Sequence, residues 1–328
     1  MGKRHFSWAT LASILVVGLA ISPAWAANPE KAIEMVIHMG PGSAPVIEGR
    51  VFATEMSKVL RKPVVPFNKE GGGGAVAYTS VKNSKPDGYT IAWNSLSILA
   101  CTNIGNVPFD YDALEHIGQV MTQPMWFTVK GDAKWQTLQE FIADAKKNPG
   151  TLKVANAGTG SSVHLAALAL HQFAGIDVIH VPMGAVRMTT GLLAGEVDAE
   201  YQVSSQVIDL IKSQKFRFLS STGEKRIPVY PDVPTMKEAG YDVVLELFRG
   251  LSVPKGTPPE VKAKLEDAMM KVAQTKAMQD LSERTGLMII TRNGADFTNY
   301  LAITDKLIKD ILKKAGLYRS GAGKAEKH

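Results

Sequence analysis

The strongest constraint on the fold is a regular alternation of short apolar runs with segments of helical periodicity. The first instance reads VIHMGPGSAPVIEGR at residues 36–50, an apolar run followed by a glycine turn and an amphipathic segment. Phe52, Met56, Val59 and Leu60 then repeat at helical spacing. Because strand–helix–strand order implies a parallel sheet covered by helices, the sequence predicts an α/β fold.

The same alternation continues along most of the chain. Strands are predicted at 33–39, 63–67, 89–93, 152–155, 178–181, 199–203 and 216–220. Helices are predicted at 75–83, 135–147, 163–173, 188–194 and 206–213. From Pro258 onward the chain is expected to be mostly helical, since Pro-Pro-Glu is a typical helix start.

The N-terminus has the pattern of an export signal. Lys3 and Arg4 precede an apolar run over residues 8–21, and Ala24-Trp25-Ala26 fits the small-x-small cleavage rule. The run is shorter than the roughly 18 uninterrupted apolar residues of a membrane span. Residues 1–26 are therefore interpreted as a cleaved signal peptide, which predicts a periplasmic protein; an uncleaved anchor is the alternative.

Charge and cysteine content argue against several classes of protein. The chain has 37 Lys and Arg against 31 Asp and Glu, a net charge of +6, which becomes +4 when cleavage of the signal peptide removes Lys3 and Arg4. This mild excess, without a basic block, gives no indication of a nucleic-acid partner. Cys101 is the single cysteine, so disulfides and cysteine-based metal sites are excluded.

Chain length and the absence of a linker indicate the domain organisation. A mature chain of this size approaches the limit for one hydrophobic core, so two lobes are expected. There is no long low-complexity linker and no fixed repeat, which favours lobes joined by crossing strands. The polar end, residues 318–328, is expected to be disordered.

Three glycine turns precede helical segments, and each is a candidate anion site because a helix N-terminus presents free N–H groups. The first turn is residues 40–43, the second residues 71–74 and the third residues 158–160. For the second, a flexible surface loop is the other reading. In the third, Ser161 or Ser162 is expected to cap the helix, and His164 is expected to brace the turn rather than to bind a ligand.

Known catalytic and cofactor motifs are not matched by these turns. Pro45 stands where a dinucleotide fingerprint has its third glycine, and no Gly-Lys-Ser/Thr follows the second turn. Val163 stands where the nucleophile-elbow motif G-x-S-x-G of hydrolases has its second glycine. An exported hydrolase is therefore a weaker alternative than a binding protein. His164 and His171 share a helix face without an acidic or cysteine ligand, so neither a metal nor a cofactor is predicted.

Several segments together resemble the Bug/TctC family of extracytoplasmic solute-binding proteins of tripartite tricarboxylate transporters. PDGYT at 86–90, HVP at 180–182 and DVPT at 232–235 form the most specific combination, and the resemblance runs from about Pro29 to Leu317. It implies an α/β type II periplasmic binding protein fold, with a ligand cleft between two lobes. Lobe I would comprise 27–122 and 250–317, lobe II would comprise 123–249, and the crossings would lie near 121–129 and 245–253.

The resemblance also implies a function and a set of site residues. Such a protein captures a small carboxylate and delivers it, as a monomer, to the permease subunits of the transporter; docking on a periplasmic signalling domain is the alternative. Family members typically hold a carboxylate through backbone N–H groups and waters of the first and third turns. The implied ligand-binding residues are Gly42, Ser43, Ala44, Gly74, Thr159, Gly160, Ser161, Ser162, Met183, Tyr201 and Phe248.

The first turn departs from the family pattern P-F-x-x-G-G-x-x-D-x-x-A-R. Val46 replaces the aspartate and Ser43 the second glycine, whereas Arg50 is kept. We expect Met183, Val46 and either Trp93 or Phe248 to make the distal pocket apolar, which would suit an aromatic or apolar-tailed carboxylate. Arg187 is a candidate partner for a second carboxylate, with an exposed helix-start arginine as the other interpretation.

Overall fold

The structure, a computed structural model, describes residues 31–319. The predicted signal peptide, residues 1–26, lies outside the described residues, as does most of the predicted tail at 318–328. At the start of that tail, the N–H of Arg319 donates to the carbonyl of Asn103 at 2.8 Å. Within residues 31–319, no helix combines the length and the apolar character needed to cross a membrane.

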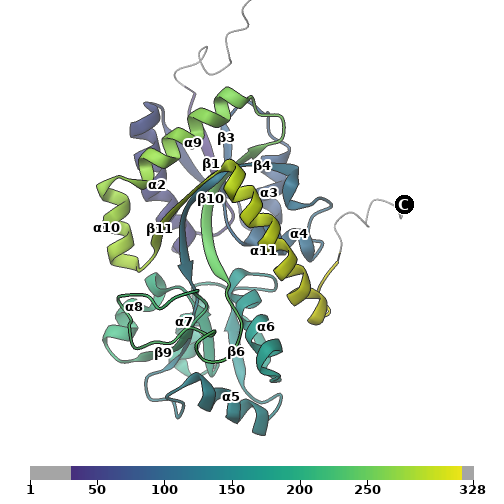
Figure 1. Cartoon of the computed structure of the whole chain (residues 1–328), viewed down its shortest axis with the longest axis vertical. Coiled ribbons are helices and arrows are strands. Elements are labelled where there is room, and N and C mark those ends of the chain that lie inside the picture. Colours follow the sequence, from purple (N-terminus) through teal and green to yellow (C-terminus); the bar gives the residue numbers. More distant parts are fainter. Residues whose placement is uncertain (1–30, 320–328) are drawn as a thin grey trace, which may run out of the picture.

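The upper half of the molecule in Figure 1 is built on a six-stranded mixed sheet, in the order β11-β4-β10-β3-β1-β2. β1 is parallel to β2 and β3, whereas β10 and β11 run antiparallel to their neighbours. Its strands are β1 (Ile33–Ile37), β2 (Val64–Asn68), β3 (Thr90–Asn94), β4 (Leu114–Pro124), β10 (Glu246–Pro254) and β11 (Met288–Asn293). Its helices are α2 (Ala44–Leu60), α3 (Ala75–Lys82), α4 (Ser97–Asn103), α9 (Pro259–Ala273), α10 (Lys276–Thr285) and α11 (Gly294–Lys314), with 3-10 turns η1 (Gly72–Gly74) and η2 (Tyr111–Ala113).

The lower half holds a five-stranded sheet in the order β7-β6-β8-β5-β9. β6 is parallel to β7 and β8, and β5 is antiparallel to β8 and β9. Its strands are β5 (Trp126–Lys130), β6 (Lys153–Asn156), β7 (Ile179–Pro182), β8 (Ala199–Gln202) and β9 (Phe216–Ser221). Its helices are α5 (Leu138–Lys147), α6 (Ser162–Ala174), α7 (Arg187–Ala194) and α8 (Ser204–Lys212).

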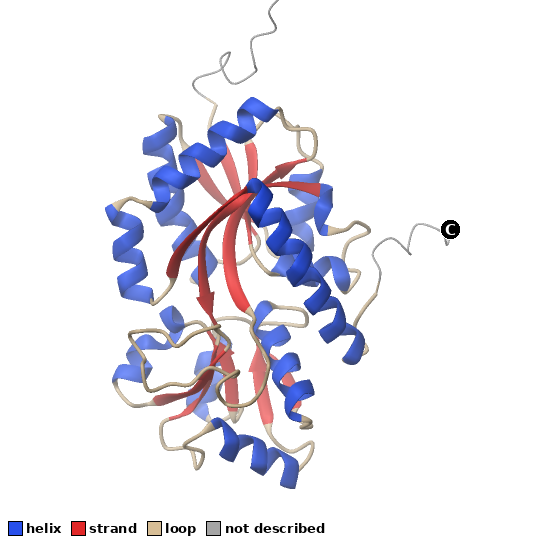
Figure 2. Cartoon of the chain, in the orientation of Figure 1, coloured by secondary structure: helices blue, strands red, loops and turns tan. Residues whose placement is uncertain are grey.

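Two adjacent chain segments connect the halves, as Figure 2 shows. β4 passes into β5 with only Met125 between them, and β10 pairs with β4 from Glu246 to Pro254. Met125 and Thr222 bind each other twice, because the Met125 N–H donates to Thr222 Oγ1 and the Thr222 N–H donates to the Met125 carbonyl, both at 2.9 Å. The crossings expected near 121–129 and 245–253 are therefore found, and the predicted lobe boundaries at 122/123 and 249/250 fall within β4 and β10.

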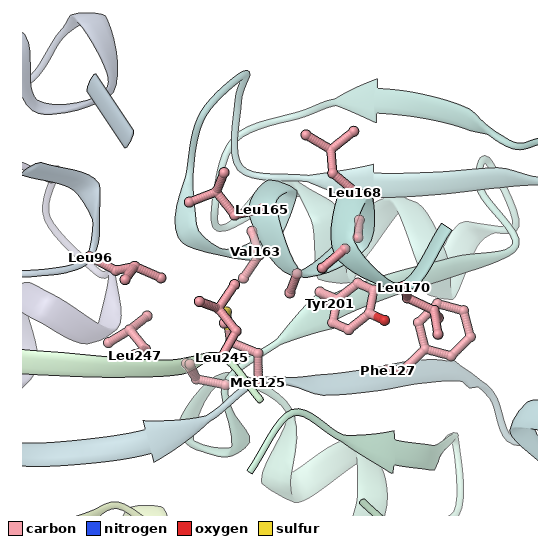
Figure 3. Packing of buried hydrophobic residues seen from close by; sticks show 14 of the residues in the cluster. Leu96, Met125, Phe127, Val163, Leu165, Leu168, Leu170, Tyr201, Leu245 and Leu247 are labelled. Carbon is pink, nitrogen blue, oxygen red and sulfur yellow. The ribbon is translucent and has the colours of Figure 1, made fainter. Parts of the chain in front are cut away.

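The hydrophobic core has two parts. One lies between the upper sheet and α2, α9 and α10, with Phe52 packed against Trp93 at 4.7 Å between ring centroids. The other begins on the opposite face of that sheet, under α3, α4 and α11, and continues through Met125 into the lower lobe (Figure 3). Since burying one large apolar side chain contributes about 1.5–3 kcal/mol, this continuous packing holds the two sheets in one molecule.

Most predicted elements are present, and the exceptions have local causes. The helix predicted to begin at residue 135 begins at Leu138, because Thr137 Oγ1 accepts the N–H of Glu140 at 3.2 Å and caps it. β11 interrupts the C-terminal region that was expected to be mostly helical. There, Gly286 in the left-handed region (φ 72°) ends α10, and the following apolar residues pair with β4.

Candidate ligand-binding site

A cleft lies where the two halves face each other. Its outer chamber has a volume of about 580 Å³ and is lined by four loops, together with Ser97 and Asn106. The upper half contributes the first and second glycine turns, and the lower half contributes the third turn and the loop ahead of α7. The predicted site residues Ser43, Gly74, Thr159, Ser161 and Met183 all line this chamber.

A smaller inner pocket of about 60 Å³ shares part of this lining and extends toward the crossing strands. Ala44 at the start of α2 lines it from the upper half, and Ser162 and Val163 at the start of α6 line it from the lower half. Leu247 and Arg249 of β10 complete it. The N-termini of two helices from different halves therefore meet at one pocket.

The first glycine turn leaves a backbone donor at the start of α2. Gly42 has φ 83°, a conformation that favours glycine, and Ser43 Oγ donates to the Gly40 carbonyl at 2.6 Å. Pro45 has no N–H, and the N–H groups of Val46 and Ile47 donate to the Ser43 carbonyl. Among residues 31–319, the N–H of Ala44 has no acceptor, so it is available to a ligand.

The third turn is held by its own side chains. Ser161 Oγ accepts the N–H of His164 at 3.3 Å, and the N–H of Gly160 donates to His164 Nδ1 at 3.1 Å. Burial, reinforced by His180, lowers the pKa of His164 to about 4, so the ring is neutral and Nδ1 can accept. The prediction that His164 braces the turn is confirmed.

Two N–H groups remain at the start of α6, those of Ser162 and Val163, which have no acceptor in the described part of the chain. Gly160 differs, because its N–H is already bound to His164 and its Cα faces Ile104 of the opposite half. The N–H of Gly160 is therefore already used within the turn.

The second turn is a left-handed glycine run. Gly71, Gly72, Gly73 and Gly74 have φ values of 127°, 58°, 65° and 111°, which side chains rarely adopt. Asn106 Nδ2 donates to the Gly72 carbonyl at 3.0 Å and ties the loop to the segment after α4. The run brings bare backbone to the wall of the outer chamber.

Two predicted site residues lie in the core and not in the cleft. Tyr201 is fully buried, 5.0 Å from the ring of Phe127, with its hydroxyl 3.8 Å from Met236 Sδ (Figure 3). Phe248 is fully buried against Phe297 and Tyr300. Neither residue lines the outer chamber or the inner pocket, because each points to the opposite face of its strand.

Val46 and Trp93, which were expected to make the distal pocket apolar, also lie outside the lining of the cleft. Both are buried in the upper core beneath α2. Met183 does line the outer chamber, together with Met39, Pro41 and Val186. Arg187 lies at the same wall, where its Nη2 is 3.1 Å from Glu196 Oε2 and both side chains are largely exposed.

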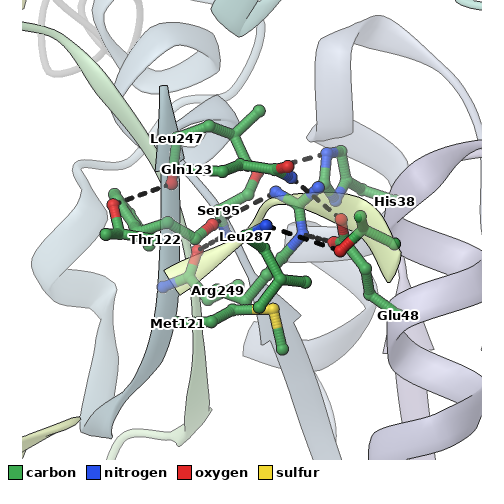
Figure 4. A network of polar contacts seen from close by, with 12 residues as sticks. His38, Glu48, Ser95, Met121, Thr122, Gln123, Leu247, Arg249 and Leu287 are labelled. Atoms are coloured by element: carbon green, nitrogen blue, oxygen red, sulfur yellow. Dashed lines mark hydrogen bonds and ion pairs between the residues drawn. The ribbon is translucent and has the colours of Figure 1, made fainter. Parts of the chain in front are cut away.

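A buried polar network at the floor of the inner pocket was not predicted (Figure 4). Arg249 Nε donates to Glu48 Oε2 at 2.7 Å, and Gln123 Nε2 donates to Glu48 Oε1 at 2.9 Å. His38 lies beside them with Nε2 3.2 Å from Ser95 Oγ, and burial followed by the charge of Arg249 lowers its pKa to about 3. The sequence signal was a lone arginine inside the apolar run LELFRGLSV.

Comparison with known proteins agrees with this architecture. Residues 49–317 match the model of the TctC family, described as tripartite tricarboxylate transporter family receptors. The UPF0065 protein in the gbd 5' region of Cupriavidus necator is 31% identical over 98% of this chain and 100% of its own. A TctC solute-binding protein from Polaromonas is 31% identical, with a TM-score of 0.72 over 87% of this chain and 99% of that chain.

Further solved structures share the fold. Periplasmic binding protein BugD is 28% identical, with a TM-score of 0.81 over 89% of this chain and 99% of its own. MatC of Rhodopseudomonas palustris with bound malate is 23% identical, with a TM-score of 0.78 over 87% of this chain and 100% of its own. An R. palustris protein with adipate is 20% identical, with a TM-score of 0.81 over 88% of this chain and 98% of its own. With its two-lobed fold, its cleft and its match over most of the chain, this protein belongs to the Bug/TctC family of solute-binding proteins.

Proposed function

We propose that this protein captures a small carboxylate in the periplasm and delivers it, as a monomer, to the permease subunits of a tripartite tricarboxylate-type transporter. One observation carries the proposal: the free N–H groups of Ala44, Ser162 and Val163 belong to two helix N-termini that converge on one pocket. Helix N-termini favour anions through these donors and through the helix dipole. Because the two helices come from different lobes, a bound carboxylate would hold the lobes together.

The ligand class has support from the structural neighbours. The solved structures with malate and with adipate hold dicarboxylates in the same fold, at 23% and 20% identity. The chemistry of the inner pocket of this chain agrees with a carboxylate, since its backbone donors face a small volume.

The tail of the ligand would lie in the outer chamber. Met39, Pro41, Met183 and Val186 give this chamber apolar walls, while Glu70 and Arg187 stand among its lining residues. An apolar or aromatic tail is therefore favoured over a polyhydroxylated one. A second carboxylate would need to compete with Glu196 for Arg187.

Hydrolysis has no support from the serine-rich turn. A nucleophilic serine needs a base within hydrogen-bond reach of its hydroxyl. Here the Nδ1 of His164 accepts the backbone N–H of Gly160, and the hydroxyl of Ser161 accepts the backbone N–H of His164.

A thermal-shift screen tests the proposal. The mature protein, from residue 27 onward, is unfolded and refolded to remove carried-over ligand, and is then heated with malate, adipate or benzoate and with benzamide as the uncharged control. Ligand at about 100 times its Kd stabilises the native state by about 2.7 kcal/mol. We expect at least one carboxylate to raise Tm by several degrees and benzamide to have no effect; a refolded protein unaffected by every carboxylate would contradict the proposal.

A further inference from the structure

Arg249 is a buried cation with an unsatisfied nitrogen. The side chain is 1% exposed and lines the inner pocket from β10. Its Nε donates to Glu48 and its Nη1 donates to the Phe248 carbonyl at 3.1 Å (Figure 4). Its Nη2 has no hydrogen-bond partner among residues 31–319.

Such an arrangement is costly unless another acceptor is supplied. A guanidinium remains protonated inside proteins, and an unmet donor on a buried charge loses its hydration without replacement. Glu48 accepts from Arg249 Nε and from Gln123, but neither of its oxygens accepts from Arg249 Nη2. The pocket that Arg249 lines offers space for the missing acceptor.

The other groups at this floor also favour an anion. Burial keeps the His38 ring neutral, and its Nδ1 is likewise without a partner in the described chain. The carboxylate of Glu48 is turned toward Gln123 and Arg249 Nε, and Glu48 does not line the inner pocket. The donors that line it include Arg249 and the free N–H groups of Ala44, Ser162 and Val163.

We propose that Arg249 Nη2 binds the carboxylate of the ligand directly at the floor of the inner pocket. This inference rests on the proposed function and specifies how that site works. A pocket of about 60 Å³ has room for a group of a few heavy atoms, so the carboxylate enters first and the rest of the molecule occupies the outer chamber. The ligand class is therefore a carboxylate whose head group enters the inner pocket while its apolar or aromatic tail stays outside it.

Isothermal titration calorimetry with malate, adipate and benzoate tests this role in three variants. Arg249→Gln should weaken binding about 10- to 100-fold, the usual effect of losing a charge-assisted hydrogen bond. Glu48→Gln should tighten binding, because it leaves the arginine uncompensated. Arg226→Gln is the matched control, since it breaks an exposed Arg–Glu pair with Glu238 and should leave Kd unchanged.

The opposite changes in affinity expected for Arg249→Gln and Glu48→Gln distinguish direct ligand contact from a purely structural ion pair. If Arg249 only held Glu48 in place, both single variants would weaken binding together, and that result would overturn the inference. Should Arg249→Gln not fold, the uncharged double variant Glu48→Gln/Arg249→Gln replaces it, and binding within about twofold of wild type would equally overturn the inference. If wild type binds none of the three carboxylates, the proposed function itself fails, and this inference fails with it.

Discussion

At the residue scale, the side chains that shape the cleft are hydrogen-bonded to the backbone of their own turn. Ser43 binds Gly40, Ser161 binds His164, and His164 binds Gly160. Each bond satisfies one group within the turn and leaves the neighbouring N–H groups facing the pocket. A polar side chain can thus determine where an anion binds without touching the anion itself.

Ser161→Ala should reduce both stability and ligand binding. The hydroxyl caps α6, and loss of an N-cap costs about 0.5–2 kcal/mol of unfolding free energy. Because the same turn presents the N–H groups of Ser162 and Val163, carboxylate affinity should fall too. Urea denaturation and calorimetry measure the two effects.

Thr137→Ala is the matched control for that prediction. Thr137 caps α5 in the same way, by accepting the N–H of Glu140, but it lines neither part of the cleft. It should lose similar stability and keep its affinity. Equal affinity in the two variants would show that the cap of α6 has no part in binding.

At the element scale, the third turn meets the opposite half of the molecule through Gly160. A Cβ built at Gly160 would lie 2.3 Å from Ile104 Cδ1, whereas one at Gly158 would have no neighbour within 4 Å. Both glycines have positive φ, 79° and 127°. Gly160→Ala therefore combines backbone strain with a close contact that the side chain of Ile104 must relieve by moving, and Gly158→Ala carries backbone strain alone.

We expect Gly158→Ala to lower the free energy of unfolding by about 1–3 kcal/mol and Gly160→Ala to lower it further. Adding Ile104→Ala should restore part of the extra loss in Gly160→Ala and none of the loss in Gly158→Ala. Denaturation of these four variants, with wild type and Ile104→Ala as references, measures this difference. If Gly160→Ala lost the same unfolding free energy with Ile104 in place and in the Ile104→Ala background, the contact with Ile104 would have no effect on stability.

At the scale of the whole molecule, buried titratable groups predict a stability maximum near neutral pH. Burial lowers the pKa of His38 to about 3 and those of His116 and His164 to about 4. As pH falls from 6.5 toward 4, the unfolded chain takes up protons that the folded chain refuses, so stability falls. Burial raises the pKa of Glu200 to about 8, so the folded chain keeps a proton that the unfolded chain has released, and the contribution of Glu200 to stability falls from pH 6.5 toward 8.

Urea denaturation at about pH 4.5, 6.5 and 8 checks this profile. Between pH 4.5 and 6.5 the effect of Glu200 opposes that of the histidines, but one carboxyl is set against several imidazoles. Glu200→Gln should flatten the alkaline side and leave the fall on the acid side. The same change in stability from pH 6.5 to 8 in wild type and in Glu200→Gln would contradict the role given to Glu200.

The sequence by itself determined the α/β class, most of the elements and the three glycine turns. Helical period, strand composition and capping residues are local properties, readable within a few neighbours. The turns that present Ser43, Thr159 and Ser161 to the cleft were recognised for this reason. The crossings were located from the family resemblance and are formed by β4, β5 and β10.

Only the tertiary structure decided which side chains face the ligand. Tyr201 and Phe248 were expected in the pocket, yet the residues that line it are their neighbours Gln202 and Arg249. Successive side chains of a strand point to opposite faces, so a one-residue difference separates core from cleft. Glu48 and Arg249 are 201 positions apart, and nothing local pairs them. They meet because the packing of α2 against the upper sheet brings them together.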